Sequence, residues 1–186
     1  PVNGLGYDLR CGIVAGIDQA AADPAVTAVV MIGSDRAFSG GADIREFGQP
    51  TQDPSLPAVI EAIEACPKAV VAAMHGAALG GGLEVTLACA ARIALQGTSL
   101  GLPEVMLGVV PGAGGPQRLP RRVGLVRAIE MIGRGERIDA AEGLRLRLLD
   151  AVVPHDLQAQ AITLAAGLGG RKCRLRDEAV SHADVD

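Results

Sequence analysis

The sequence predicts an α/β domain in which buried strands alternate with helices. Short apolar runs, several of them rich in β-branched residues, are separated by segments with a helical spacing of apolar residues. The chain has 186 residues, which is enough for one domain, or most of one, with a substantial core. Apolar residues make up 49% of the chain and aromatic residues only 2%, so we expect a core of Ala, Val, Leu and Ile.

The first part of the chain contains two predicted helices and two predicted strands. Apolar residues share one stripe over 7–22, which predicts a helix. Residues 25–33 read AVTAVVMIG, which is typical of a short buried strand. A loop is expected over 34–41, a second helix over 57–65 and a second buried strand over 68–75.

The second part of the chain contains several short predicted elements. Asp139 and Glu142 have the spacing of a capping box with Asp in place of Ser or Thr, so a helix should begin there. Loops, turns and short helices are expected between the third strand and Pro111. The other predicted elements are a helix over 82–90, a strand over 92–95, helical pieces over 113–133, a strand over 151–153 and a helix over 156–167.

Two glycine-rich stretches, each with a glutamate, are candidates for a functional site. The first runs from Gly76 to Glu84 and the second from Leu102 to Gly115. Glycine lets the backbone approach a ligand closely, and a carboxylate beside such a loop can act as an acid or a base. Taken singly, the glycines could serve only close packing, and Glu84 and Glu104 could be ordinary acids at helix starts. The two stretches together favour a functional site.

The spacing of the glycines argues against two kinds of nucleotide site. A dinucleotide site needs Gly-x-Gly-x-x-Gly and an acid at the end of the next strand, whereas the first stretch reads GAALGGG and no acid follows in that place. A phosphate loop needs Gly-Lys followed by Ser or Thr, which the sequence lacks. Free amides at a helix start can instead hold a developing oxyanion. Gly81 and Gly82 could supply one such donor, and the loop over 38–44 a second.

Four segments carry a resemblance to a known family. They are FSGGADI at 38–44, KAVVAAMHGAALGGGLEVTLAC at 68–89, LGLPEVMLGVVPGAGGPQRLPRRVG at 100–124 and DAAEGLRLRLLDAVV at 139–153. Together they resemble the crotonase (enoyl-CoA hydratase/isomerase) superfamily. The likeness is greatest to the hydratase half of multifunctional β-oxidation proteins, which join it to a 3-hydroxyacyl-CoA dehydrogenase.

The resemblance implies a fold and a set of site residues. The fold is a crotonase-like ββα spiral, here lacking the first strand and the C-terminal helices. The backbone amides of Ala42 and Gly81 would form an oxyanion hole for a thioester carbonyl. Glu104 would donate a proton to C2 of the substrate, and Glu84 would orient the attacking water. The residues that would bind CoA are Ser39, Gly41, Asp43 and Ile44.

The reaction implied by these residues is hydration of a trans-2-enoyl-CoA to a 3-hydroxyacyl-CoA in fatty acid β-oxidation, with Δ3-Δ2 enoyl-CoA isomerisation as a related activity. One alternative is another acyl-CoA reaction on the same scaffold, such as thioester hydrolysis or decarboxylation. Another is a non-catalytic acyl-CoA-binding module. The CoA thioester would be the substrate, so no separate cofactor, no metal and no NAD are expected for this chain.

The expected organisation is a hydratase/isomerase domain over 1–170, incomplete at both ends, followed by a linker or tail over 171–186. A following dehydrogenase domain and self-association are the expected protein partners. A net charge of −4, with one Tyr and two Phe as the only aromatic residues, argues against nucleic-acid binding. No apolar run reaches the length of a membrane span, and four scattered cysteines fit a cytoplasmic location.

Overall fold

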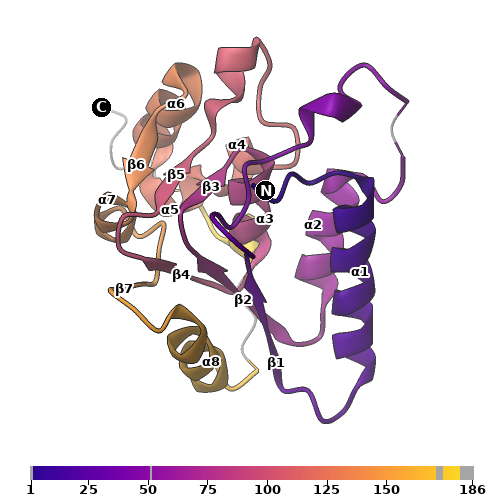
Figure 1. Cartoon of the computed structure of the whole chain (residues 1–186). Coiled ribbons are helices and arrows are strands. Elements are labelled where there is room, and N and C mark those ends of the chain that lie inside the picture. The colour runs from indigo at the N-terminus through magenta and orange to yellow at the C-terminus, as the bar shows by residue number, and fades with distance from the viewer. Residues whose placement is uncertain (1, 51, 171–173, 181–186) are drawn as a thin grey trace.

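The computed structural model describes residues 2–50, 52–170 and 174–180, and this part of the chain forms two small sheets (Figure 1). The larger sheet is parallel throughout, with the order β1 (Ala28–Ile32), β2 (Ala69–Met74), β4 (Ala91–Leu95) and β7 (Ala151–Val153). The smaller sheet has the order β3 (Ala77–Leu79), β5 (Ser99–Gly101) and β6 (Arg137–Asp139), with β6 antiparallel to β5.

Most of the helices are short. The α-helices in the described part of the chain are α1 (Tyr7–Ala22), α2 (Leu56–Ala65), α3 (Gly81–Ala88), α4 (Gly115–Arg118), α5 (Pro120–Val123), α6 (Leu125–Arg134), α7 (Ala140–Arg145) and α8 (Leu157–Gly167). The 3-10 helices are η1 (Ile44–Glu46), η2 (Pro103–Leu107) and η3 (Leu175–Asp177). Within the residues that the structure describes, no helix combines the length and the apolar character needed to cross a membrane.

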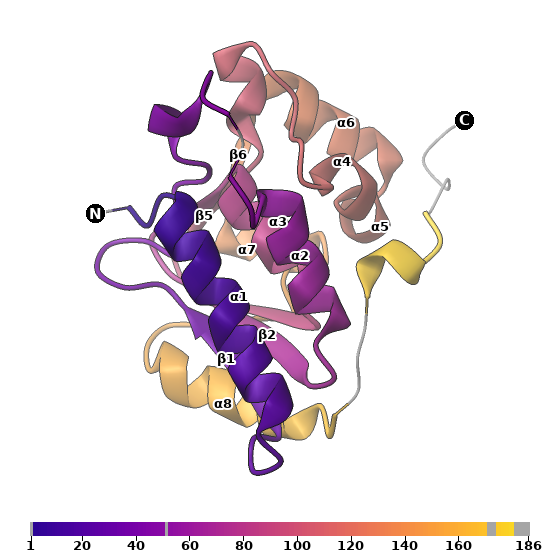
Figure 2. The same cartoon turned by 90° about the vertical axis from the view of Figure 1, so that its right-hand side faces the viewer.

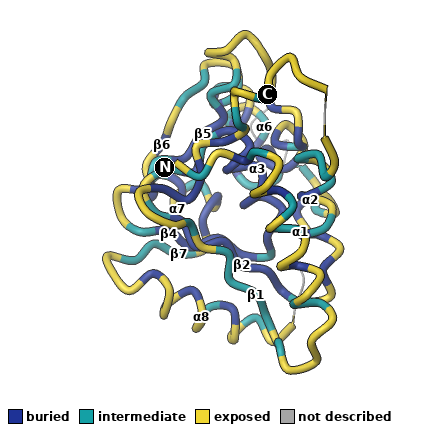
Figure 3. Tube along the Cα trace, turned by 45° about the vertical axis from the view of Figure 1, so that its right-hand side comes forward, coloured by how far each residue is buried: buried dark blue, intermediate teal, exposed yellow. Residues whose placement is uncertain are grey.

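Helices cover both faces of the larger sheet, which explains why its strands are apolar without interruption. In β2, Val71 and Ala73 pack in a cluster with residues of α8, whereas Val70 and Met74 belong to the main core on the other face. On that second face lie α1, α2 and α3 (Figures 1 and 2). Figure 3 shows the buried trace at the centre of the molecule, running through β2 and α3. The first glycine-rich stretch begins at the exposed Gly76 and enters the core at its other end, where Gly80 to Glu84 are buried.

The structure confirms the α/β class and the strands of the larger sheet. The predicted strands over 25–33 and 68–75 contain β1 and β2, with one or more extra residues at each end. The smaller sheet contradicts the prediction of loops, turns and short helices at 99–101, and it adds a strand at 77–79, for which no element was predicted. Each of its strands is three residues long, which is too short to show a period in the sequence. Pairing between segments distant in the chain makes them strands.

Asp139 behaves as the capping residue that the sequence predicts, but only half of the capping box forms. Its side chain accepts a hydrogen bond from the amide of Glu142 at 2.8 Å, which caps α7. The Glu142 carboxylate pairs with Arg145 on the next turn of the helix. Ser55 caps α2 in a similar way, and the helix predicted over 57–65 consequently begins one residue earlier, at Leu56.

Gly76, between β2 and β3, is the glycine where a side chain should be most costly. Its φ is +63°, and an added Cβ would overlap the backbone carbonyl oxygen of Arg36. We expect Gly76→Ala to lower the free energy of unfolding by at least about 2 kcal/mol in urea denaturation. Gly12→Ala on the exposed side of α1 is the matched control, because its methyl group meets nothing within 4 Å. It should raise stability by about 0.5–1 kcal/mol. Equal stability of the two variants would contradict the backbone geometry at Gly76.

Candidate active site

A cavity of about 740 Å³ lies beside the N-terminus of α3. Its walls come from four segments that are distant in the sequence, namely 40–47, 56–57, 80–84 and 103–113, with Arg137 added from β6. Apolar side chains form most of the surface, but two carboxylates and several backbone amides reach it. The predicted catalytic and oxyanion residues all line this cavity. They are Ala42, Gly81, Glu84 and Glu104.

Glu84 is fixed by hydrogen bonds from the second glycine-rich stretch. It lies in the first turn of α3 and is 2% exposed. Its Oε1 accepts hydrogen bonds from the amides of Ala113 at 2.9 Å and Gly115 at 2.8 Å. Burial raises the pKa of Glu84, while these two amides and the charge of Arg118 act in the opposite direction. The two hydrogen bonds thus fix Oε1, and Glu84 also lines the cavity.

Glu104 has a different environment, because one of its carboxylate oxygens, Oε2, lacks a hydrogen-bond partner among the described residues. Glu104 lies in η2, directly after Pro103, and its Oε2 is buried. The other oxygen, Oε1, lies against Gly80, where an added Cβ would be 3.0 Å away. Burial, together with the negative charge of Glu84, raises the pKa of Glu104 to about 7. Glu104 can therefore gain or lose a proton near neutral pH, and the residue lines the cavity.

The amides of Ala42 and Gly81 lie close together at the same cavity. A Cβ added to Gly81 would be 3.4 Å from the amide nitrogen of Ala42, and one added to Gly41 would be 3.5 Å from that of Gly81. Gly41 has a φ of +103°, a value that side chains disfavour. Within the described part of the chain, neither the Ala42 nor the Gly81 N–H donates to a protein acceptor. Two free donors side by side have the arrangement of an oxyanion hole.

The comparisons with known proteins place this chain in a family. The Enoyl-CoA hydratase/isomerase family matches residues 1–175 of the chain. The chain belongs to this family. A peroxisomal bifunctional enzyme of Danio rerio is 46% identical over 171 residues, which cover 92% of this chain and 24% of the relative. A probable enoyl-CoA hydratase of Bacillus subtilis is 46% identical over 156 residues, covering 80% of this chain and 60% of the relative.

Solved structures of enoyl-CoA hydratases have the same fold. The enoyl-CoA hydratase from Bacillus anthracis matches with a TM-score of 0.83 and 36% identity, covering 90% of this chain and 68% of that structure. The predicted crotonase-like class is therefore confirmed. The chain spans only 24% of the length of the Danio rerio relative and 22% of a glyoxysomal multifunctional protein of Brassica napus.

The four residues that the resemblance implied for CoA binding fall into two groups. Gly41 and Ile44 line the cavity, and Ile44 is 67% exposed at its edge. Ser39 is buried, and its hydroxyl donates to the carbonyl oxygen of Asn3 and accepts from the amide of Gly41. Asp43 pairs with Arg45 and lies outside the main cavity, in a neighbouring one. Contacts of these four residues with CoA stay predictions, and Ser39 has a structural task in shaping the loop.

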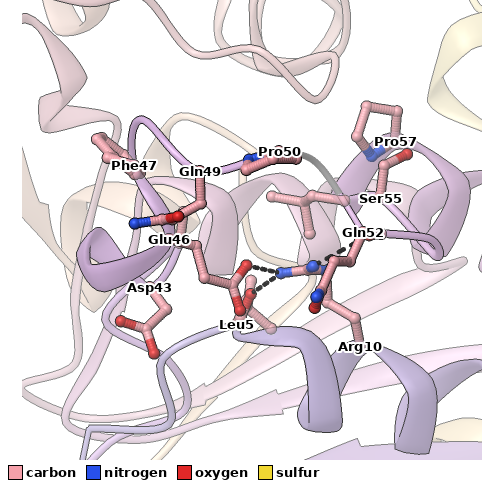
Figure 4. Close-up of a pocket in the computed structure, with 12 residues that line it drawn as sticks. Leu5, Arg10, Asp43, Glu46, Phe47, Gln49, Pro50, Gln52, Ser55 and Pro57 are labelled. Atoms are coloured by element: carbon pink, nitrogen blue, oxygen red, sulfur yellow. Dashed lines mark hydrogen bonds and ion pairs between the residues drawn. The ribbon is translucent and has the colours of Figure 1, made fainter.

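A second cavity of about 490 Å³ adjoins the first in this enoyl-CoA hydratase/isomerase chain (Figure 4). The two share lining residues, among them Ala42 and Phe47. Figure 4 shows Arg10 at its floor, bonded to Glu46 at 2.6 Å. Arg10 also donates to the carbonyl oxygens of Leu5, Gln52 and Pro54. The arginine thus ties the loop after the oxyanion segment to the start of α1.

Sequence reasoning missed the residues that hold Glu84. The amides of Ala113 and Gly115 lie in the second glycine-rich stretch, for which the sequence analysis proposed a carboxylate but no amide donor. The available signal was the run of glycines itself, since a Cβ on Gly115 would lie 3.0 Å from Glu84 Oε1. For metal ions, no suitable group of three or more His, Cys, Asp or Glu side chains occurs among the residues described.

The raised pKa of Glu104 should make stability fall as pH rises. The folded protein retains a proton on Glu104 up to about pH 7, whereas the unfolded chain releases it near the ordinary glutamate pKa of 4.5. Between these values the folded state binds more protons, so the free energy of unfolding decreases with increasing pH. Glu104→Gln removes this titration. We expect Glu104→Gln to gain stability relative to wild type between pH 5 and pH 8 in urea denaturation. A constant difference between the two proteins would contradict the shift.

Proposed function

We propose that the protein adds water to trans-2-enoyl-CoA thioesters, giving 3-hydroxyacyl-CoA in fatty acid β-oxidation. The observation that carries this proposal is the meeting of Glu84 and Glu104, from different elements, at one cavity beside the paired amides of Ala42 and Gly81. Two carboxylates next to an oxyanion hole suit proton transfer on either side of a polarised double bond. The names of the relatives support the same activity.

In the proposed mechanism, the thioester carbonyl accepts hydrogen bonds from the amides of Ala42 and Gly81. This draws electrons from the double bond and makes C3 electrophilic. The water oxygen bonds to C3, the π electrons move to the carbonyl oxygen, and the amides stabilise the resulting enolate. Glu84 takes one proton from the water, and Glu104 gives one to C2 as the carbonyl re-forms. Each turnover adds H and OH to the double bond, and a proton passing from Glu84 to Glu104 restores the pair.

The environments of the two glutamates support this division of roles. Burial raises the pKa of Glu84, and the two backbone hydrogen bonds on Oε1 oppose this rise and fix the direction of the carboxylate. An ionised, oriented carboxylate can hold and deprotonate a water molecule. Glu104 has a pKa of about 7, so it carries a proton in a large fraction of molecules near neutral pH. Glu104 also lines the cavity, so it can reach a substrate bound there.

Isomerisation of a Δ3 to a Δ2 enoyl-CoA is a second candidate activity. It needs one group that takes a proton from C4 and returns it to C2, while the same oxyanion hole holds the enolate. The pKa of Glu104 near 7 suits transfer in both directions. Glu104 alone could therefore perform the isomerisation, and Glu84 would not be required.

The experiment that tests the proposed function is a direct assay with two substrates. Crotonyl-CoA should lose its conjugated double bond as water adds, and 3-hexenoyl-CoA should gain one if the isomerase activity is present. The double variant Glu84→Gln/Glu104→Gln is the control for background hydration. Release of free CoA would favour a thioester hydrolase, and loss of CO₂ from a malonyl-type thioester a decarboxylase. Tight binding of an acyl-CoA without turnover would point to a binding module.

The wider setting of the chain is also a proposal. The great length of the multifunctional relatives supports a covalently attached dehydrogenase domain, which would use NAD in its own site rather than in this one. The alternative protein partner is a second copy of this chain. The cytoplasmic location stays a prediction, because several relatives are named peroxisomal or glyoxysomal. Activity assays of fractionated cells would decide the compartment.

A further inference from the structure

The loop that holds Glu84 is itself held by an arginine. The two amides bonded to Glu84, those of Ala113 and Gly115, flank Gly114. Arg118 is the last residue of α4, the short helix that begins at Gly115. Its Nη1 lies 3.4 Å from the carbonyl oxygen of Gly114. An added Cβ on Gly114 would overlap that Nη1. The guanidinium group therefore contacts the carbonyl of the peptide whose N–H, that of Gly115, donates to Glu84. The absence of a side chain on Gly114 leaves room for this contact.

Arg118 is in turn paired with a buried carboxylate. Its Nε donates to Glu64 Oε1 at 2.9 Å, and Glu64 is 2% exposed. Glu64 lies in the last turn of α2, whose first residue, Leu56, lines the main cavity. A buried ion pair contributes little net stability, because both charges lose their hydration. Such pairs more often fix one arrangement of the elements that carry them, and here the elements are α2 and the 113–115 loop.

A second arginine reaches Glu64 from the segment 174–178. Arg176 Nη1 lies 3.2 Å from Glu64 Oε2, an ion pair without the alignment of a hydrogen bond. The segment is fastened by Leu175, which is 1% exposed, and by Arg121, whose Nε donates to the carbonyl oxygen of Glu178 at 2.7 Å. Figure 2 shows η3, in yellow, beside α5. The Glu64 carboxylate is thus held by Arg118 on one oxygen and by Arg176 on the other.

We propose that Glu64 and Arg118 are positioning residues for Glu84, and that Arg176 fixes Glu64 for this task. The proposal rests on the proposed hydration function, since it assigns the pair to the placement of a catalytic carboxylate. Without the pair, the 113–115 loop is released, and the two amides no longer direct Glu84 Oε1. The charged groups near Glu84 are Glu104 across the cavity and Arg118 behind the loop. Both remain in a Glu64→Gln protein, which removes only the carboxylate charge that pairs with Arg118 and Arg176.

The first test compares Glu64→Gln with wild type in two independent measurements. We expect kcat for crotonyl-CoA hydration to fall about 10- to 100-fold with little change in KM, because a small displacement of a catalytic group is costly. Hydrogen exchange of the Ala113 and Gly115 amides should become faster, as seen by NMR. Glu142→Gln is the matched control, since it breaks the ion pair with Arg145 on α7. The control should change neither measurement.

A double variant separates positioning from stability. Arg118→Met alone leaves Glu64 buried with only Arg176, so it should destabilise the protein strongly. Glu64→Gln/Arg118→Met removes both charges and should recover most of that stability. If the pair positions Glu84, the double variant is folded but still slow, with fast exchange at the Ala113 and Gly115 amides. Recovery of kcat together with stability would overturn the proposal.

Arg176→Gln tests the contribution of the segment 174–178. Because the Arg176 side chain is 43% exposed, we expect the same changes on a smaller scale, with kcat reduced by up to about five-fold. Unchanged kcat and unchanged amide exchange would remove Arg176 from the proposal. If the wild-type protein does not hydrate crotonyl-CoA, the proposed function fails on that result. The amide exchange still decides whether Glu64 and Arg118 hold the loop.

Discussion

Replacing Glu104 with glutamine should lower kcat for hydration by about 10²- to 10⁴-fold, the usual contribution of a general acid. Glutamine has the shape of glutamate but no transferable proton, so C2 of the enolate would have to be protonated by water. Binding should change little, because in the proposed mechanism the amides of Ala42 and Gly81, rather than Glu104, hold the thioester. Steady-state kinetics with crotonyl-CoA give kcat, and calorimetry with butyryl-CoA, which cannot react, gives the affinity.

The pH dependence adds a second signature to this prediction. The proposed mechanism needs protonated Glu104 and ionised Glu84, so wild-type kcat/KM should fall as pH rises through about 7, the pKa of Glu104. In Glu104→Gln this limb should disappear. The pH dependence of kcat/KM that remains in Glu104→Gln should report the ionisation of Glu84. The apparent pKa of Glu84 should differ from that in wild type, because the two carboxylates influence each other. Glu61→Gln, an exposed position on α2, is the matched control. A Glu104→Gln enzyme with wild-type activity would show that another group donates the proton.

The parts of the fold that could be predicted from sequence are those with long, regular patterns. The strand over 68–75 and the helix over 7–22 carry enough apolar residues in sequence for a period to be recognised, and both exist within a residue or two. The smaller sheet could not be predicted in the same way. The strand over 77–79 forms because Gly76 turns the chain and Ser99–Gly101 pairs with it, and neither event leaves a local pattern.

The candidate site shows a similar division. Glu84 and Glu104 were recognisable because each carboxylate adjoins a glycine-rich stretch. The support of Glu84 was not, because its donors, Ala113 and Gly115, are defined by backbone atoms that any residue has. Buried polar groups are satisfied by partners distant in the chain, and one sequence does not reveal such pairs. The resemblance supplied Ala42 as an oxyanion donor, and its proximity to Gly81 is a property of the fold.

Gly81→Ala should lower kcat by about 10²- to 10³-fold while leaving the fold intact, because the added methyl group would obstruct the oxyanion donors although both N–H groups remain. The added methyl group would lie 3.4 Å from the amide nitrogen of Ala42, on the surface where the thioester oxygen should be held. It would also lie 2.6 Å from Leu56 Cδ2, the end of a flexible side chain that can move aside. Alanine is a better helix former than glycine, so the first turn of α3 should tolerate it.

The control for this substitution is Gly133→Ala, a glycine in α6 where an added methyl group meets nothing within 4 Å. Neither variant should lose stability in urea denaturation, and only Gly81→Ala should lose activity. Because the amides act on charge that develops in the transition state, the loss should appear in kcat more than in KM. If Gly81→Ala lost binding of butyryl-CoA and kcat stayed normal at saturation, the amide would serve substrate binding. The enolate would then be stabilised by other donors.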